Sequence, residues 1–199
     1  MTRNPGWWFS IPMALACASA AGADADFTDC FHHDRYEMTL MSGAMFSPIG
    51  ADKHRSTENY TLSGLQFGWM LTDVNDAGWL RGNWEVSLEA MGGKVFVGKG
   101  SYLVGGTVWF RYNFVQPNWR VVPYLEAGGG AEATDMDRKL IGQTFNFNLD
   151  VAAGARYFVA PNWALDLECR YQHLSNGTIA KHDIGINAVG PMLGVSYFF

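Results

Sequence analysis

Residues 145–159, FNFNLDVAAGARYFV, alternate between two kinds of side chain along their whole length. The odd-numbered positions are apolar or aromatic, whereas Asn146, Asn148, Asp150 and Arg156 occupy positions between them. A period of two indicates a β-strand with one apolar and one polar face. A polar face with charges of both signs is unusual for a dry protein core. It is typical of a strand whose apolar face contacts lipid and whose polar face lines a narrow lumen where opposite charges pair.

The same alternation recurs, less cleanly, in seven further segments, which are residues 36–46, 58–71, 79–91, 101–114, 119–131, 163–173 and 186–199. Each is about ten residues or longer, the length that crosses a bilayer at a tilt. Eight strands make the smallest closed barrel, and closure pairs every backbone group inside lipid. The sequence therefore predicts an all-β fold, an eight-stranded antiparallel transmembrane β-barrel of the bacterial outer membrane. Its lumen is expected to hold a structural charge network, formed by Asp150, Arg156, Asp166, Glu168 and Arg170.

The connections between the predicted strands alternate in length. Residues 72–78, 115–118 and 160–162 are short, whereas residues 47–57, 92–100, 132–143 and 176–185 are longer. Short turns face the periplasm in such barrels, and long loops face outside. Tryptophans lie near strand ends, as an aromatic girdle requires; they are Trp69, Trp79, Trp119 and Trp163. The terminal Phe199 resembles the signal by which bacterial outer-membrane barrels are recognised for insertion, which indicates a Gram-negative source.

The N-terminus has the features of a secretory signal peptide over residues 1–23. Arg3 precedes an apolar stretch, residues 7–18, and Ala21-Gly22-Ala23 is a small-residue cleavage site. No run reaches the ~18–20 apolar residues of a membrane-spanning helix. Residues 24–35 are then a periplasmic segment and residues 36–199 the barrel. Loss of the signal removes one positive charge and no acidic residue, so the net charge changes from −5 to −6, which argues against nucleic acid as a partner.

Two cysteines, Cys30 and Cys169, remain after the signal, and their spacing indicates no disulfide. The loop sequence DMDRK, residues 135–139, is interpreted as a solvated outer loop. Its Arg138 and Lys139, and Lys181 in the last loop, are candidates for contact with lipid phosphates. The oligomeric state is left open, a homodimer included.

A histidine and a serine fall on the apolar, outward face of the seventh strand. Carrying the parity of residues 163–171 forward places His173 and Ser175 there, at the outer end and ~6–7 Å apart between Cα atoms. A serine hydroxyl beside an imidazole is the nucleophile and base pair of acyl transfer. On the neighbouring strand Asn187 also points outward and could orient the ring. Backbone N–H groups at Asn176 and Gly177 could form an oxyanion hole.

Spacing alone leaves a second interpretation open. Histidine and serine are common at the outer ends of such strands, where they meet the membrane interface. The chain could then be a non-enzymatic surface barrel of the OmpX or adhesin kind. An eight-stranded barrel is filled by its own side chains, so in either case the function is expected on the loops or the outer surface.

The segment HLSNGTIAKHDIGIN, residues 173–187, resembles the signature of the lipid A 3-O-deacylase (PagL) family. The close match covers about fifteen residues, and the strand count, signal peptide and terminal Phe agree over the whole chain. The resemblance implies an outer-membrane serine esterase that removes the ester-linked 3-hydroxyacyl chain at the 3-position of lipid A. It implies His173 as general base and Ser175 as nucleophile, with lipopolysaccharide of the outer leaflet as partner and no metal or cofactor. Asn176 belongs to the motif, and Gly185 to its Gly-x-Asn ending.

Two positions depart from the family pattern. Asn187 stands where the characterised pattern has a glutamate, and it can orient a histidine but supplies no negative charge to an imidazolium. Asp183 stands where an asparagine is frequent. Its carboxylate would oppose a developing oxyanion, and the alternative is that it helps to orient His173. A third function class follows, an inactive relative that binds lipopolysaccharide without cleaving it.

Overall fold

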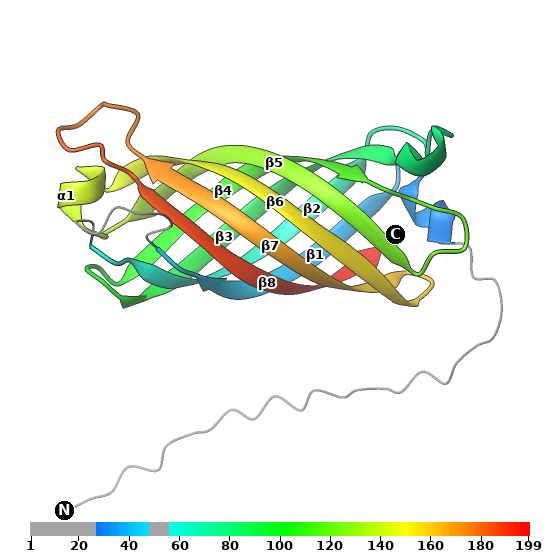
Figure 1. Ribbon diagram of the computed structural model, residues 1–199, viewed down its shortest axis with the longest axis horizontal. Coiled ribbons are helices and arrows are strands. Elements are labelled where there is room, and N and C mark those ends of the chain that lie inside the picture. Colours follow the sequence, from blue (N-terminus) through cyan, green and yellow to red (C-terminus); the bar gives the residue numbers. More distant parts are fainter. Residues whose placement is uncertain (1–26, 48–55) are drawn as a thin grey trace, which may run out of the picture.

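The computed structural model describes residues 27–47 and 56–199, and the predicted signal peptide lies outside them. Eight antiparallel strands close into one barrel in sequence order (Figure 1). They are β1 (Tyr36–Met45), β2 (Asn59–Met70), β3 (Asn83–Val97), β4 (Tyr102–Asn113), β5 (Val121–Thr134), β6 (Phe145–Ala160), β7 (Trp163–Ser175) and β8 (Ile186–Phe198). The predicted eight-stranded antiparallel barrel is confirmed. Below, the end with the short turns is called the periplasmic end and the opposite one the outer end.

The largest error of the sequence prediction concerns β3. This strand begins at Asn83, because Trp79 lies in a short 3₁₀ helix, η2 (Gly78–Leu80). It continues to Val97, so residues 92–97 are not part of the outer loop that the sequence predicted. Gly92 and Gly93 were assigned to that loop, but both residues are paired with β4. Gly93 lies so close to the Thr61 carbonyl that a Cβ would not fit, and close backbone approach is a frequent reason for glycine inside a strand.

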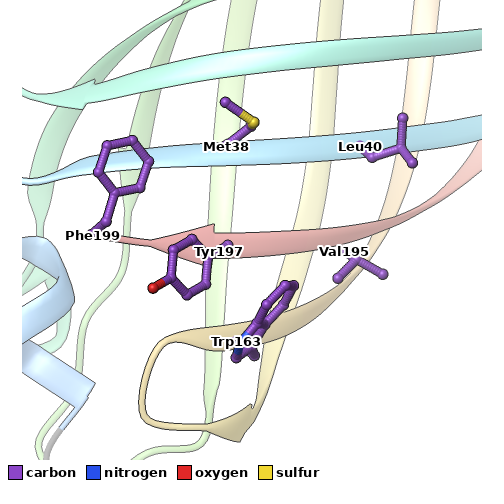
Figure 2. A pocket seen from close by; sticks show the side chains of 6 residues that line it. All are labelled: Met38, Leu40, Trp163, Val195, Tyr197 and Phe199. Carbon is purple, nitrogen blue, oxygen red and sulfur yellow. The ribbon is translucent and has the colours of Figure 1, made fainter. Parts of the chain in front are cut away.

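The two faces of the strands differ as the alternation predicted. Outward positions are apolar and exposed, for example Leu149 (63%), Leu167 (59%) and Leu193 (64%). Figure 2 shows six outward side chains of this kind around a shallow hollow near the periplasmic end, contributed by β1, β7, β8 and the chain terminus. The four tryptophans of the predicted girdle are exposed at that end as well. This surface is the one that meets lipid.

The middle of the lumen holds three buried arginines and the carboxylates that surround them. Arg111 contacts Glu37, Glu85 and Glu126 at 2.9, 3.0 and 2.6 Å. Arg156 contacts Asp166 at 3.3 Å, and Arg170 contacts Glu168 at 2.8 Å and Glu89 at 3.0 Å. Asp150 accepts hydrogen bonds from Asn148 and Thr107. The predicted lumenal charge network is therefore confirmed, and buried charges are tolerated because they are paired and hydrogen-bonded.

An apolar cluster fills each end of the lumen. At the periplasmic end, the 3₁₀ helix η1 (Phe27–Phe31) packs Phe27 and Phe31 against Phe158. At the outer end, the short helix α1 (Arg138–Ile141) contributes Leu140 and Ile141 to a cluster of strand residues. Both described cysteines are free thiols. No helix among the described residues is long and apolar enough to span a membrane.

Candidate active site

The outward face of β7 becomes polar at its outer end. Along this strand buried residues alternate with exposed ones, and Tyr171, His173 and Ser175 are all partly exposed on the outward side. Ser175 is the last residue of the strand, two positions beyond the end that the sequence predicted. The chain then passes through the loop of residues 176–185 into β8, at the same end of the barrel as α1 (Figure 1).

His173 and Asn187 form a hydrogen-bonded pair across β7 and β8. The two residues are direct partners in the strand register. The ring atom Nδ1 of His173 lies 2.7 Å from Oδ1 of Asn187. When Nδ1 carries the proton and donates it to this oxygen, Nε2 is left with a free lone pair. The geometry therefore suits a neutral imidazole that acts as a base through Nε2.

Ser175 is close to His173 along the strand but not hydrogen-bonded to it. Its Oγ has no hydrogen-bond partner among residues 27–47 and 56–199, and it lies on the outward surface beside Phe147 of β6. Catalytic hydrogen bonds are often long or absent before the substrate binds. Residues two positions apart on one strand face have Cα atoms ~6–7 Å apart, a spacing across which a serine hydroxyl and an imidazole can form a hydrogen bond.

Asp183 organises the turn that follows Ser175. Its carboxylate accepts hydrogen bonds from the backbone N–H of Asn176 at 2.9 Å and of Thr178 at 2.7 Å. Within the described residues it makes no hydrogen bond to His173. Asp183 thus occupies the backbone donor of Asn176, which the sequence suggested for an oxyanion hole. The N–H of Gly177 has no acceptor in the described chain, and Gly177 adopts a φ of +63° in this turn.

The side chain of Asn176 is buried and connects the loop to α1. Its Nδ2 donates to the carbonyl of Ile141 at 2.9 Å. The carbonyl of Leu140 in turn accepts from the N–H groups of Ile184 and Gly185, at 2.9 and 3.0 Å. Both ends of the loop are therefore held by consecutive carbonyls of α1, which is fixed in the mouth of the barrel by its own buried side chains.

Residues 135–139 are consequently not the fully solvated loop that the sequence predicted. Arg138 and Lys139 are exposed, but Met136 and Asp137 are buried. Burial raises the pKa of Asp137, but hydrogen bonds from the Lys139 N–H, Lys99 and Ser56 outweigh this effect and hold the pKa below its usual range. The apolar Met136 between two aspartates was the signal in the sequence that this segment folds inward.

Tyr171 is the site residue that the sequence reasoning missed. Its hydroxyl donates to Oδ1 of Asn187 at 2.9 Å. The signal was present, because Tyr171 shares the parity of His173 and lies two positions before it. It was interpreted only as an apolar outward residue. Within the described ranges no three His, Cys, Asp or Glu side chains are grouped closely enough to hold a metal ion.

Comparisons with known proteins agree with the barrel. Among solved structures, the outer-membrane enzyme PagL has a TM-score of 0.57 at 18% identity, over 79% of this chain and 97% of that chain. Neisserial surface protein A has a TM-score of 0.58 at 18% identity, over 83% and 97%. The N-terminal barrel of Pseudomonas aeruginosa OprF has a TM-score of 0.52 at 20% identity, over 84% and 98%. These similarities establish the fold. No curated protein sequence matches the chain.

The family comparison is more specific. The family model described as lipid A 3-O-deacylase (PagL) matches residues 59–196, a range that runs from the start of β2 into β8 and contains every site residue described above. The family and the barrel together imply a protein of the Gram-negative outer membrane. Because the match extends over more than half of its length, the chain belongs to the lipid A 3-O-deacylase (PagL) family.

Proposed function

We propose that this protein is an outer-membrane serine esterase that removes the ester-linked 3-hydroxyacyl chain at the 3-position of lipid A. The observation that carries the proposal is the pairing of His173 Nδ1 with Asn187 Oδ1 at 2.7 Å, with Ser175 two positions further along the same outward face. This arrangement supplies a base with a defined tautomer next to a hydroxyl nucleophile. It faces the membrane, where a lipid ester is found.

In the first half-reaction, Nε2 of His173 takes the proton of the Ser175 hydroxyl while Oγ attacks the ester carbonyl carbon. The N–H of Gly177, which has no acceptor among residues 27–47 and 56–199, is the donor that we assign to the oxyanion. The tetrahedral intermediate then collapses. His173 returns the proton to the sugar oxygen, and the 3-O-deacylated lipid leaves with a free hydroxyl group.

In the second half-reaction, a water molecule takes the place of the sugar oxygen. His173 removes a proton from the water, the resulting hydroxide attacks the acyl-serine, and a 3-hydroxy fatty acid is released with Ser175 regenerated. Asn187 keeps the proton of Nδ1 in place throughout. Asp183 fixes the turn that carries Gly177, and its carboxylate is already occupied by two backbone N–H groups, so it is directed into the loop and away from the oxyanion.

The decisive experiment is mass spectrometry of lipid A from cells that express the wild type, Ser175→Ala or Ser63→Ala. Ser63 is a matched control, because it is an exposed outward serine of β2 that bonds Ser42 at 2.8 Å. We expect the wild type and Ser63→Ala to remove one 3-hydroxyacyl group and Ser175→Ala to remove none. Unchanged lipid A from folded wild type would instead favour a lipopolysaccharide-binding relative or a non-enzymatic surface barrel. Deacylation by Ser175→Ala would exclude the serine mechanism.

A further inference from the structure

The side-chain oxygen of Asn187 faces two donors at once. Oδ1 lies 2.7 Å from Nδ1 of His173 and 2.9 Å from the hydroxyl of Tyr171. Tyr171 and His173 are outward neighbours on β7, and Asn187 stands opposite His173 on β8. The three side chains thus form a short hydrogen-bonded group on the outward surface, with the amide oxygen at its centre.

An asparagine at this position creates a problem that a carboxylate does not have. The two ends of an amide differ, since the oxygen accepts hydrogen bonds and the NH₂ group only donates them. If the NH₂ group faced the ring, Nδ1 would have to accept, the proton would reside on Nε2, and the base for Ser175 would be lost. A carboxylate presents an acceptor with either oxygen. Orientation of the Asn187 amide therefore decides whether His173 can act as a base.

We infer that Tyr171 is a positioning residue, whose hydroxyl holds the Asn187 amide with its oxygen toward His173 and thereby fixes the Nδ1–H tautomer. A phenol hydroxyl is a good donor, and its oxygen, conjugated with the ring, is a weaker acceptor. It therefore favours the orientation in which it meets Oδ1. No proton is transferred to or from Tyr171 during the reaction, and it touches neither the nucleophile nor the ester. The kinetic part of this inference rests on the proposed function, whereas the tautomer does not.

Three variants test the inference, with Asn187→Glu alone as the reference for the double substitution. Tyr171→Phe removes the hydroxyl alone, and Tyr157→Phe makes the same change on the outward face of β6 at the periplasmic end, where Tyr157 is 48% exposed. Tyr171→Phe combined with Asn187→Glu removes the hydroxyl beside a carboxylate that needs no orientation. Loss of one neutral hydrogen bond corresponds to about a threefold to tenfold lower kcat. We expect this loss for Tyr171→Phe alone, with KM unchanged, and less than about a twofold change for Tyr157→Phe and for the hydroxyl deletion in the Asn187→Glu background.

The tautomer itself is read by ¹⁵N NMR of the histidine rings in the refolded barrel, at a pH about two units above the ordinary imidazole pKa of ~6.5. The chain has five histidines, and the His173 signals are assigned by their absence from His173→Gln. In the wild type and Tyr157→Phe we expect one protonated and one unprotonated nitrogen, with the proton on Nδ1. In Tyr171→Phe we expect both signals to move toward the average of the two tautomers.

The outcomes separate this inference from the proposed function. Wild-type kcat and unchanged ring signals in Tyr171→Phe would overturn it while leaving the serine mechanism intact. An equal loss of kcat with and without the Asn187→Glu substitution would also overturn it, because the hydroxyl would then act by another route. If the wild type deacylates nothing but the ring signals still shift in Tyr171→Phe, the proposed function fails and the positioning role of Tyr171 stands.

Discussion

Gly185 offers a sharp test of the proposed site because a single added methyl group would contact the imidazole ring of His173. Gly185 adopts a φ of +78°, and a Cβ built on it would lie 2.9 Å from Cε1 of His173 and 3.2 Å from the Leu174 carbonyl oxygen. Cε1 is the ring atom between the two nitrogens. Any movement of the ring away from this contact therefore displaces Nδ1 and Nε2 together.

The size of the effect follows from these distances. Two carbon atoms are at their best separation at ~3.5–4.0 Å, so the ring of Gly185→Ala must withdraw by about 0.6–1 Å. A comparable movement would stretch the 2.7 Å contact of Nδ1 with Asn187 to the limit of a hydrogen bond, ~3.2 Å or more. Misplacement of a reacting group by ~1 Å costs about 100-fold in rate. We expect kcat to fall by about 10- to 100-fold.

Backbone strain must be separated from displacement of the ring. Alanine at a positive φ costs about 1–2 kcal/mol of stability wherever it is placed. Gly78, in η2 at the periplasmic end, provides the matched control, since its φ is +59° and a Cβ there would meet nothing within 4 Å. Gly78→Ala and Gly185→Ala should therefore lose similar free energies of unfolding, measured by urea titration in detergent, while only Gly185→Ala loses activity.

The assay is release of 3-hydroxy fatty acid from lipopolysaccharide in mixed micelles, quantified by mass spectrometry at saturating substrate. Folding of each variant is verified by its heat-modifiable migration in gel electrophoresis. Wild-type kcat in folded Gly185→Ala would refute the reasoning, because a base displaced by about 0.6–1 Å should not support the wild-type rate. An equal loss of kcat in Gly78→Ala would show that strain in the barrel, not the position of His173, limits the rate.

Three further substitutions test the loop after Ser175, the hydrogen-bond partner of His173 and a buried carboxyl group at the outer end of the barrel. The carboxylate of Asp183 accepts two backbone hydrogen bonds, at 2.9 and 2.7 Å, that hold the turn after Ser175, and Asp183→Asn keeps only one of them. We expect kcat to fall about tenfold with little change in the free energy of unfolding. Wild-type kcat would show that the turn needs no carboxylate. Asn187→Glu places a carboxylate beside Nδ1 and should raise kcat, about tenfold or more, by stabilising the imidazolium; a lower kcat would mean that the site is adapted to the amide. The pKa of Glu58 is raised from 4.5 to about 7, mainly by burial. The folded state therefore binds this proton more tightly than the unfolded state. As a result, the free energy of unfolding decreases as pH rises from about 4.5 to 7. The unfolding free energy of Glu58→Gln should therefore increase relative to that of the wild type over this range, and a constant difference from pH 4 to 8 would contradict the assignment.

The barrel could be predicted almost completely because its physics is local to each strand. The alternation of residues 145–159 predicts which side chains of β6 face lipid and which face the lumen. The observed strand is one residue longer than the predicted one. The error at Gly92-Gly93 arose because a glycine required by close packing and a glycine required by a turn are identical in sequence. Only the neighbouring strand distinguishes them, and the position of the Thr61 carbonyl is a fact of the closed barrel.

In the site too, contacts within one hairpin could be predicted from the sequence, whereas contacts between distant loops could not. The contact of His173 with Asn187 follows from parity and hairpin register, and the same reasoning extended by one step would have included Tyr171. The hydrogen bonds that tie Asn176, Ile184 and Gly185 to the carbonyls of α1 could not be derived, because they join two loops more than 30 residues apart in the chain. No periodicity specifies which loops meet above the mouth of a barrel.

The polarity of the outward face of β7 limits where in the membrane this site can act. Toward the periplasmic end the face is apolar and open to lipid, with Leu165 49% and Leu167 59% exposed. Tyr171 then brings a ring with a polar tip, which suits the boundary between acyl chains and headgroups, and His173 and Ser175 follow at the outer end. An ester carbonyl deep among the acyl chains would lie beside Leu165 and Leu167, which offer it neither a nucleophile nor a hydrogen-bond donor. Cys169, the next residue on this face, is paired with Ala153 and Pro191, neither of which is a base. The proposed chemistry is therefore confined to esters at the height of the sugar headgroup, so the depth of the carbonyl in the leaflet selects the bond that is cut.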